Sequence, residues 1–408
     1  MYPPELTCTS RADSGKRLST SRRLIFSLLQ HIKGAGLHLR DPHLGSRFFG
    51  EPGAALQAEV SVHHSRVYRR ILGGGSIAAA ETFMDGDWDS PDLTAVIQVL
   101  AINISVVDKL GSRFSLLPAL INKTRHLLRH NSVRQAQRNI AAHYDLGNDF
   151  YRTFLDPSML YSSAWYQQPE MSLEQAQQAK MRRLCDQLAL TCDDHLLEIG
   201  TGWGALAEFA AREYGCRVTT TTISQEQYDF SCRRIAEAGL SERVTILKED
   251  YRHLRGQYDK LVSVEMIEAV GQHYIPLFFA RCNQLLKPGG RLALQAITIS
   301  EARYASYARN VDFIQRYIFP GGFLPALSLL EKNLAENRFE LHCRLDIGAD
   351  YARTLQAWRE RFEAAWHPLQ NGRLDAHFRR MWLFYLCYCE AGFLAETIGT
   401  VQLTATRK

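Results

Sequence analysis

The chain has 408 residues, of which 46% are hydrophobic and 22% are charged. This length predicts two or three domains, and this composition excludes a collagen-like, coiled-coil or wholly disordered chain. The net charge is only +5, from 48 Lys and Arg residues against 43 Asp and Glu residues, which is too small an excess to indicate a nucleic-acid-binding protein.

The first 25 residues hold five basic residues among Ser and Thr but no apolar core, so we expect a flexible tail over residues 1–20 and not a secretory signal. The most apolar stretch, Leu93 to Val107, contains polar residues and is shorter than the ~20 residues that span a bilayer. The nine cysteines have the spacing of neither a zinc site nor a disulfide framework. We therefore expect a cytoplasmic protein with buried thiols and without a metal site.

Residues 21–130 are predicted to form a smaller, mixed N-terminal domain. The run RRLIFSLLQHI is typical of a helix ending near Gly34 and Gly36, and the alternating LQAEVSVHH is typical of a strand. Gly73, Gly74 and Gly75 are predicted to form a turn that leads into a helix.

Residues 108–140 carry seven basic residues against one acidic residue, Asp108. Arg125 and Arg129 are four residues apart and would share one face of a junction helix. One interpretation is a solvated linker helix. The other is docking to an anionic lipid surface, to which each basic residue contributes about 1 kcal/mol. No nucleic-acid recognition motif accompanies the charge.

Residues 131–408 are predicted to form an α/β catalytic domain. Ser172 and Gln175 have the spacing of a helix-capping box, and apolar strands alternate with amphipathic helices after it. This alternation favours a doubly wound, mostly parallel, Rossmann-like sheet.

A glycine-rich turn follows the first strand of this sheet. Gly200, Gly202 and Gly204 differ in spacing from the dinucleotide fingerprint, and Glu198 precedes them at the strand end. The turn has either a structural role or a ligand-binding role, because glycine permits both sharp bends and close approach of a ligand. The pattern is similar to motif I of S-adenosylmethionine-dependent methyltransferases.

The second strand ends without the acidic residue that usually binds ribose hydroxyls. Thr222, Ser224 and Gln227 are neutral alternatives as hydrogen-bonding groups. Asp250 and Tyr251 follow the third strand, where they would face an adenine ring.

Beyond about residue 60 the chain resembles the cyclopropane fatty acid synthases and mycolic acid methyltransferases. The resemblance rests on several stretches in the same order, namely GSIAAAETFMDGDW, HYDLGNDFYRTFLDPSMLYSSAWY, LLEIGTGWGALAEFA, TTISQEQYDF, SVEMIEAVG, YIFPGGFLP, GADYARTLQAWRERF and FYLCYCEAGF.

This resemblance implies a methyl transfer from S-adenosylmethionine to the cis double bond of a phospholipid acyl chain. A carbocation forms, a base removes a proton, and a cyclopropane ring closes. The residues that match cofactor-contacting positions are Tyr161, Ser162, Leu196, Leu197, Glu198, Ile199, Gly200, Thr201, Gly202, Trp203, Gly204, Thr222, Ile223, Ser224, Gln225, Glu226, Gln227, Asp250 and Tyr251.

The resemblance also implies a bound bicarbonate ion that acts as the base. The expected holders of this ion are Ser163, Glu268, Gln295, Ile297 and Tyr351. Ser163 replaces a cysteine that is usual in the family, and Gln295 replaces a histidine. Both can still bind an anion, but neither titrates near neutrality as histidine does. The product is therefore either a cyclopropane or a methyl-branched or methylene-bearing chain.

Other residues have both a structural and a functional interpretation. Cys389 matches a cysteine once favoured as the nucleophile in the family, but a buried structural thiol on an apolar helix is the favoured interpretation. His143, Tyr144 and Asp145 are interpreted as a polar cluster over the cofactor or a structural cap. The aromatic residues of an acyl-binding insertion at about 300–345 are expected to cover an acyl tunnel or fill a subdomain core.

We therefore expect an enzyme that associates peripherally with the cytoplasmic face of the membrane and acts on unsaturated phospholipid in an anionic surface. The resemblance also suggests a homodimer. The alternatives are a methyltransferase for a soluble small molecule and a non-catalytic lipid-binding protein.

Overall fold

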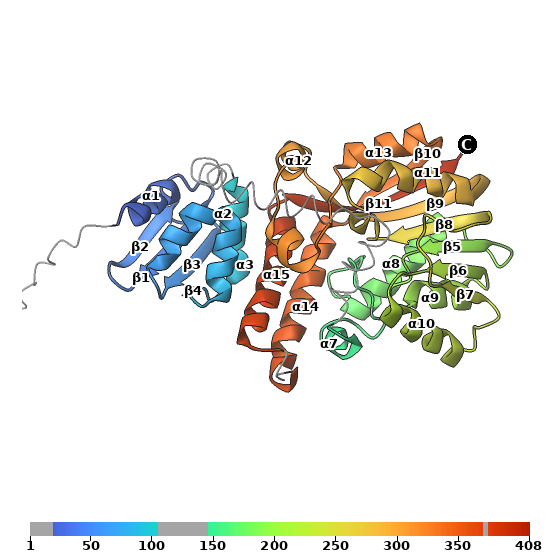
Figure 1. The fold of residues 1–408 in the computed structure, drawn as a ribbon, viewed down its shortest axis with the longest axis horizontal. Helices are drawn as coiled ribbons and strands as arrows, with labels where there is room; N and C mark the ends of the chain where they lie inside the picture. The colour runs from blue at the N-terminus through green and yellow to red at the C-terminus, as the bar shows by residue number, and fades with distance from the viewer. Residues whose placement is uncertain (1–18, 105–145, 370–373) are drawn as a thin grey trace, which may run out of the picture.

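The computed structural model describes residues 19–104, 146–369 and 374–408. Two β-sheets organise these residues, one of four strands in the N-terminal part and one of seven strands in the C-terminal part. Figure 1 shows the two sheets separated by a pair of long helices, α14 and α15. None of the described helices is both long and apolar enough to cross a membrane.

The N-terminal unit (residues 19–104) is a mixed sheet with the strand order β2-β1-β3-β4, in which β1 and β3 are parallel. Its core contains Phe26, Leu37 and Val60. Its elements are α1 (Thr20–Leu29), β1 (Ala35–Asp41), β2 (Gly45–Gly50), β3 (Leu56–Val62), α2 (Arg66–Met84), β4 (Trp88–Asp89) and α3 (Leu93–Ile102).

The predicted glycine turn in this unit is only partly confirmed, because Gly75 is non-helical and a helix follows it, but a helix also precedes it. Helix α2 begins at Arg66, seven residues before Gly73, and the glycines lie inside it. Gly75 has φ +59° and ψ −140°, so the helix is kinked there instead of starting there. Local sequence could not distinguish a turn before a helix from a kink within one, since glycine permits both.

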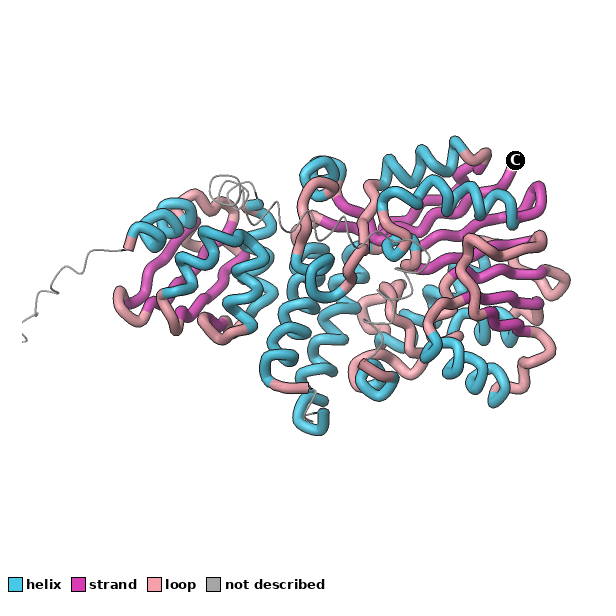
Figure 2. Tube along the Cα trace, in the orientation of Figure 1, coloured by secondary structure: helices cyan, strands magenta, loops and turns pink. Residues whose placement is uncertain are grey.

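The larger sheet confirms the predicted α/β class. Its strand order is β10-β11-β9-β8-β5-β6-β7 (Figure 2). The pairs between β5, β6, β7, β8 and β9 are parallel, and β10 and β11 are antiparallel. The strands are β5 (His195–Ile199), β6 (Arg217–Thr221), β7 (Val244–Leu247), β8 (Tyr258–Val264), β9 (Leu286–Ile299), β10 (Phe339–Asp346) and β11 (Ile398–Arg407).

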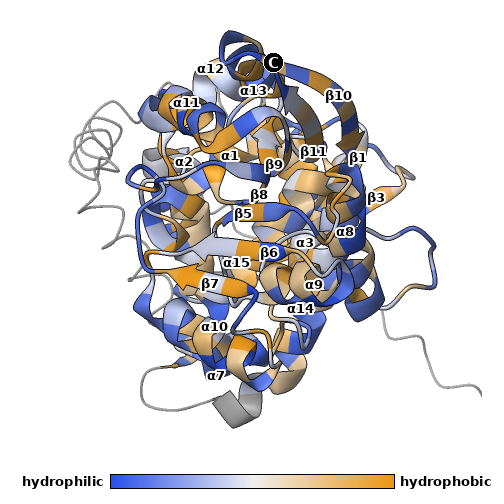
Figure 3. Ribbon diagram, turned by 90° about the vertical axis from the view of Figure 1, so that its right-hand side faces the viewer, coloured by the Kyte–Doolittle hydropathy of each residue, from blue (hydrophilic) through white to orange (hydrophobic). Residues whose placement is uncertain are grey.

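Amphipathic helices flank this sheet, and several of them carry both hydrophilic and hydrophobic residues in Figure 3. Ser172 and Gln175 form the predicted capping box at the start of α8. The helices are α7 (Asn148–Arg152), α8 (Leu173–Gln187), α9 (Ala205–Glu213), α10 (Gln225–Glu237), α11 (Ile275–Leu285), α12 (Glu301–Tyr307), α13 (Leu327–Glu336), α14 (Gly348–Leu369) and α15 (Ala376–Leu394), with short turns η1 (Ile267–Ala269), η2 (Gln272–Tyr274) and η3 (Ile314–Ile318).

Helix α15 joins the two units. It packs against α2 and α3 of the N-terminal unit and against α14 on its other side. The Arg380 guanidinium donates to the carbonyl of Trp88 at 2.9 Å, and Thr94 donates to the buried Glu390 carboxylate at 3.2 Å. The two units therefore share one continuous apolar core.

Candidate active site

A cavity of about 1210 Å³ extends from the carboxyl ends of the parallel strands into the N-terminal unit. It is therefore large enough for a cofactor together with part of an extended apolar ligand. The N-terminal unit contributes almost entirely apolar side chains to it, among them Ile25, Leu28, Leu37, Leu39, Val60, Val62, Val96, Ile97 and Leu100.

The glycine turn forms one wall of this cavity. Gly200, Gly202 and Gly204 have φ values of +106°, +52° and +82°, which favour glycine at each position. A Cβ atom on Gly200 would lie 3.2 Å from the Met266 side chain. The backbone amides of Gly200 and Thr201 both donate to the carbonyl of Thr221, which ties the turn to β6.

Glu198 lies at the end of β5 directly before this turn. Its side chain is buried and accepts a hydrogen bond from the Thr220 hydroxyl at 2.5 Å. Burial raises the pKa of this carboxyl to about 8. A ligand ammonium or amino group placed here would favour the ionised carboxylate.

The ends of β6 and β7 contribute neutral and paired groups. Thr222 donates to the Gln227 amide oxygen at 2.9 Å, so these two expected cofactor residues bind each other. Burial pushes the pKa of Asp250 upward, but hydrogen bonds and charge from Arg252 outweigh it and leave the pKa low. The Tyr251 hydroxyl is buried and has no hydrogen-bond partner among the described residues, so it is available to a ligand.

Most residues expected to bind the cofactor line the cavity. Leu196 and Leu197 instead lie in the apolar core of β5, Ser224 caps α10, and Gln225 and Glu226 are exposed at its start. Gly204 is the N-cap of α9 and does not line the cavity. The residues that do line it are Tyr161, Ser162, Glu198, Ile199, Gly200, Thr201, Gly202, Trp203, Thr222, Ile223, Gln227, Asp250 and Tyr251.

Glu265, at the end of β8, is a cavity residue that the sequence reasoning missed. Its Oε1 accepts from the backbone amide of Ser163 at 2.9 Å and from the Gln295 amide at 2.8 Å. Its Oε2 accepts from the Tyr351 hydroxyl at 2.7 Å. It lies within the SVEMIEAVG stretch, three residues before Glu268, and nothing in the local sequence distinguishes it as a site residue.

Glu265 also has an unusual backbone. Its φ is +47°, in the left-handed region that favours glycine. Such a conformation costs of order 1–3 kcal/mol and is found where surrounding structure enforces it, often at active sites.

Two further buried groups surround this carboxylate. The Lys180 ammonium donates to the Ser162 hydroxyl at 2.6 Å, and burial lowers its pKa to about 8. Glu268 accepts from the backbone amide of Ile297, and its other oxygen has no partner within the described part of the chain. Burial, followed by the nearby charge of Glu265, raises the pKa of Glu268 to about 8.

The residues expected to hold bicarbonate therefore do not fit an additional anion. Ser163, Gln295 and Tyr351 already direct their donors at Glu265, and Ile297 directs its amide at Glu268. A bicarbonate ion here would add a negative charge beside the Glu265 carboxylate, whose two oxygens already accept from these donors, so the like charges would repel in a buried site.

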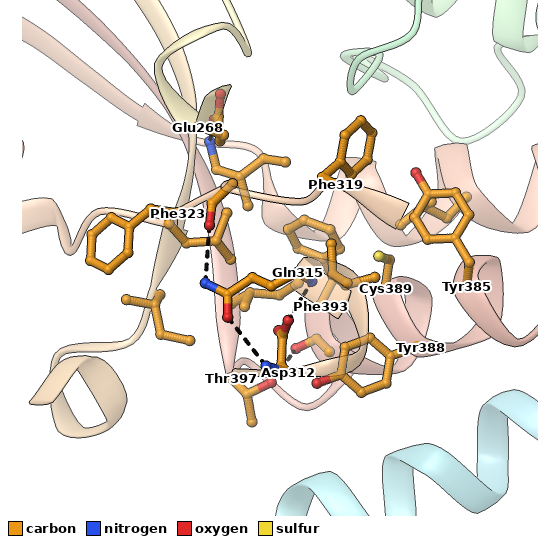
Figure 4. Close-up of a pocket in the computed structure, with 18 of the residues that line it drawn as sticks. Glu268, Asp312, Gln315, Phe319, Phe323, Tyr385, Tyr388, Cys389, Phe393 and Thr397 are labelled. Carbon is orange, nitrogen blue, oxygen red and sulfur yellow. Dashed lines mark hydrogen bonds between the residues drawn. The ribbon is translucent and has the colours of Figure 1, made fainter. Parts of the chain in front are cut away.

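Aromatic side chains and Cys389 line the middle of the cavity (Figure 4). The hydroxyls of Tyr161 and Tyr385 are 2.7 Å apart, and the Phe319 ring centroid lies 6.4 Å from each of the two tyrosine rings. Burial raises the pKa of the Cys389 thiol, so a thiolate is disfavoured. Within the predicted acyl-binding insertion at about 300–345, the residues that line the cavity lie between 303 and 324. The rest of this segment forms β10, the edge strand of the larger sheet, and α13, which packs against β10.

Two predicted features lie outside the described residues. These are the basic segment at 108–140 and the polar cluster of His143, Tyr144 and Asp145.

Comparisons with known proteins agree with this geometry. A family model described as mycolic acid cyclopropane synthetase matches residues 131–403. The tuberculostearic acid methyltransferase UfaA1 of Mycobacterium tuberculosis is 38% identical, over 99% of this chain and 93% of its own length. The cyclopropane-fatty-acyl-phospholipid synthase of Escherichia coli is 35% identical, over 86% of this chain and 88% of its own.

Among solved structures, the cyclopropane synthase MmaA2 from Mycobacterium tuberculosis has a TM-score of 0.62 and 30% identity, and the match covers 66% of this chain and 98% of that one. The mycolic acid cyclopropane synthase CmaA1, complexed with SAH and CTAB, has a TM-score of 0.61 and 28% identity over the same shares of the two chains.

Proposed function

We propose that this chain, which belongs to the mycolic acid cyclopropane synthetase family, transfers a methyl group to the cis double bond of an unsaturated phospholipid acyl chain. It is an S-adenosylmethionine-dependent methyltransferase of the cyclopropane fatty acid synthase type. The observation that carries the substrate proposal is the cavity, which joins the glycine turn to an apolar space lined by both units.

S-adenosylmethionine supplies an electrophilic methyl group when it is bound. The glycine turn allows its close approach, Glu198 is placed to accept from an amino group, and the Tyr251 hydroxyl is available to a polar edge. These residues would position the cofactor at the carboxyl ends of β5 and β6, where ligands of doubly wound sheets bind.

An alkene is a weak nucleophile, so the protein must hold it in line with the methyl group. The apolar walls of the cavity would align the acyl chain and exclude water, which would otherwise trap a carbocation. Tyr161, Phe319 and Tyr385 present aromatic rings to the same space. Their faces favour developing positive charge, an effect of about 0.5–2 kcal/mol per ring.

The first product that we propose is a cyclopropane fatty acid, because the Escherichia coli relative is named for this product. A methylene-bearing or methyl-branched chain is the second. It is favoured by the similarity to UfaA1 over 99% of this chain and by Gln295, which replaces the usual histidine.

The test is incubation of the purified protein with methyl-labelled S-adenosylmethionine and vesicles of unsaturated phosphatidylglycerol. We expect label in the acyl chains, and chromatography against standards would separate the ring from the methylene product. Label transferred only to soluble metabolites would favour a small-molecule methyltransferase. Failure to bind S-adenosylhomocysteine by calorimetry would favour a non-catalytic lipid-binding protein.

We further propose that the enzyme works at the cytoplasmic face of an anionic membrane. The basic segment at 108–140 is the motive for this proposal, because several positive charges near a surface add to a substantial attraction.

A further inference from the structure

We propose that the Glu265 carboxylate is itself the proton acceptor of the reaction, in the place where a bicarbonate ion was expected. This inference rests on the proposed methylation of an alkene, which leaves a carbocation that must lose a proton. It goes further by assigning the base to a side chain of the protein.

The donors around Glu265 carry the inference. Three groups from separate segments converge on its two oxygens: the amide of Ser163, the side-chain amide of Gln295 and the hydroxyl of Tyr351. All three residues were expected to hold bicarbonate. A carboxylate and a bicarbonate ion present a similar planar pair of oxygens, so the same donors suit either group.

Donors and a positive charge around Glu265 offset part of the cost of burying its negative charge, although its pKa stays raised. Burial raises its pKa, and the hydrogen bond from Gln295 followed by the positive charge of Lys180 opposes that shift. Glu268, the other carboxylate nearby, lacks such a donor set, and burial together with the charge of Glu265 raises its pKa to about 8. Two neighbouring carboxylates with different environments are a common arrangement for separate acid and base roles.

The backbone at Glu265 is a second, independent indication. A left-handed φ of +47° would be relaxed by glycine, yet a glutamate occupies the position with its side chain in the cavity wall. Strain of this kind is retained where the side chain has a function that depends on its placement.

The step balances without a further reactant. The π electrons of the alkene would form the new bond to the methyl carbon while the methyl–sulfur bond of S-adenosylmethionine breaks, and that electron pair would stay on sulfur to leave S-adenosylhomocysteine. The neighbouring alkene carbon becomes the cation. A Glu265 oxygen takes one proton from the methyl group. The released C–H electron pair closes a ring onto the cation. Alternatively, a hydride first moves from the methyl-bearing carbon to the cation, which leaves the methyl-bearing carbon positive. The released C–H pair then forms a methylene double bond to that carbon. Glu265 ends as a neutral carboxylic acid and returns its proton to water after product release.

Glu265→Gln and Glu265→Gly test the assignment in two ways. Glutamine keeps the size of the side chain but cannot accept the proton, so we expect turnover to fall at least about 100-fold. Glycine relieves the backbone strain and frees the donors of Ser163, Gln295 and Tyr351 for an external anion. Glu237→Gln on the exposed face of α10 is the matched control.

The assays compare buffers depleted of carbon dioxide with buffers containing added bicarbonate. We expect wild-type turnover to be indifferent to bicarbonate, and the ¹³C NMR signal of labelled bicarbonate to show binding to the Glu265→Gly variant but not to the wild type. Bicarbonate-dependent wild-type turnover, bicarbonate binding to the wild type, or a Glu265→Gln variant retaining more than about a tenth of wild-type turnover would overturn the assignment.

Binding of S-adenosylhomocysteine by each variant confirms that it is folded. If the wild type methylates no lipid under any condition, the proposed function fails, and the bicarbonate-binding comparison still reports on the site of the anion. The two failures are therefore distinguishable.

Discussion

At the scale of single residues, three buried carboxylates in the cavity differ in the groups that contact them. Glu198 contacts a threonine beside the glycine turn, Glu265 accepts from three donors, and Glu268 has one oxygen without a partner among the described residues. Burial raises the pKa of all three, but the donors around Glu265 best compensate its negative charge. Their positions along one cavity would separate the proposed cofactor contact of Glu198 from the proposed proton transfer to Glu265.

Binding of S-adenosylhomocysteine is expected to release a proton from Glu198. With a pKa of about 8 the carboxyl is mostly protonated at pH 7, and it ionises when it accepts from the ligand's amino group. Affinity should therefore rise as pH increases from about 6 to 8, by up to about tenfold per pH unit. Calorimetry in buffers of different ionisation enthalpy measures this, and Glu198→Gln should remove the dependence. Equal affinity at both pH values would refute the linkage.

Cys389 is expected to be dispensable for chemistry. Burial raises the pKa of its thiol and disfavours the thiolate that nucleophilic attack requires. Cys389→Ser should keep turnover within about threefold of wild type, because a small buried side chain is replaced by one of similar size. Steady-state methyl transfer is the measurement, and a loss beyond about 100-fold would restore the nucleophile hypothesis.

At the scale of elements, the kink in α2 shapes the cavity. Gly74 and Gly75 line the cavity together with Ser76, and α15 packs against the same helix. A regular helix through these positions would direct its side chains differently. The kink therefore helps to set which residues of α2 line the apolar part of the cavity.

Gly75→Ala should lower the free energy of unfolding by about 1–3 kcal/mol, because alanine is strained at φ +59° although no atom lies within 4 Å of the added Cβ. Gly73→Ala is the matched control, since its Cβ is equally unobstructed and its φ is not in the positive range. It should be neutral or stabilising by up to about 1 kcal/mol. Urea denaturation of both variants compares them, and equal effects would contradict the role of the kink.

At the scale of the whole molecule, the sequence predicted those features that depend on neighbouring residues. These are the capping box of Ser172 and Gln175, the turn at Gly200, Gly202 and Gly204, and the α/β alternation, and the structure agrees with all three. The role of Glu265 could not be predicted, because its partners Ser163 and Tyr351 are 102 and 86 residues away. The kink at Gly75 was missed because its neighbours permit both turn and helix.

The proposed docking to an anionic membrane would also involve the whole molecule. Replacing Lys123, Arg125 and Arg129 with Gln should weaken binding to anionic vesicles by about 3 kcal/mol at low salt, with the difference shrinking as salt screens the charges. Vesicle co-sedimentation measures this, and cofactor affinity should be unchanged. Unaltered vesicle binding would favour a solvated linker.

The proposed methyl transfer into phospholipid acyl chains can be measured by mass spectrometry of vesicle lipids. After incubation of the purified enzyme with S-adenosylmethionine and unsaturated phosphatidylglycerol, we expect acyl chains heavier by one CH₂ group, with the head group unchanged. Acyl chains of unchanged mass, in the presence of enzyme that binds S-adenosylhomocysteine, would contradict it.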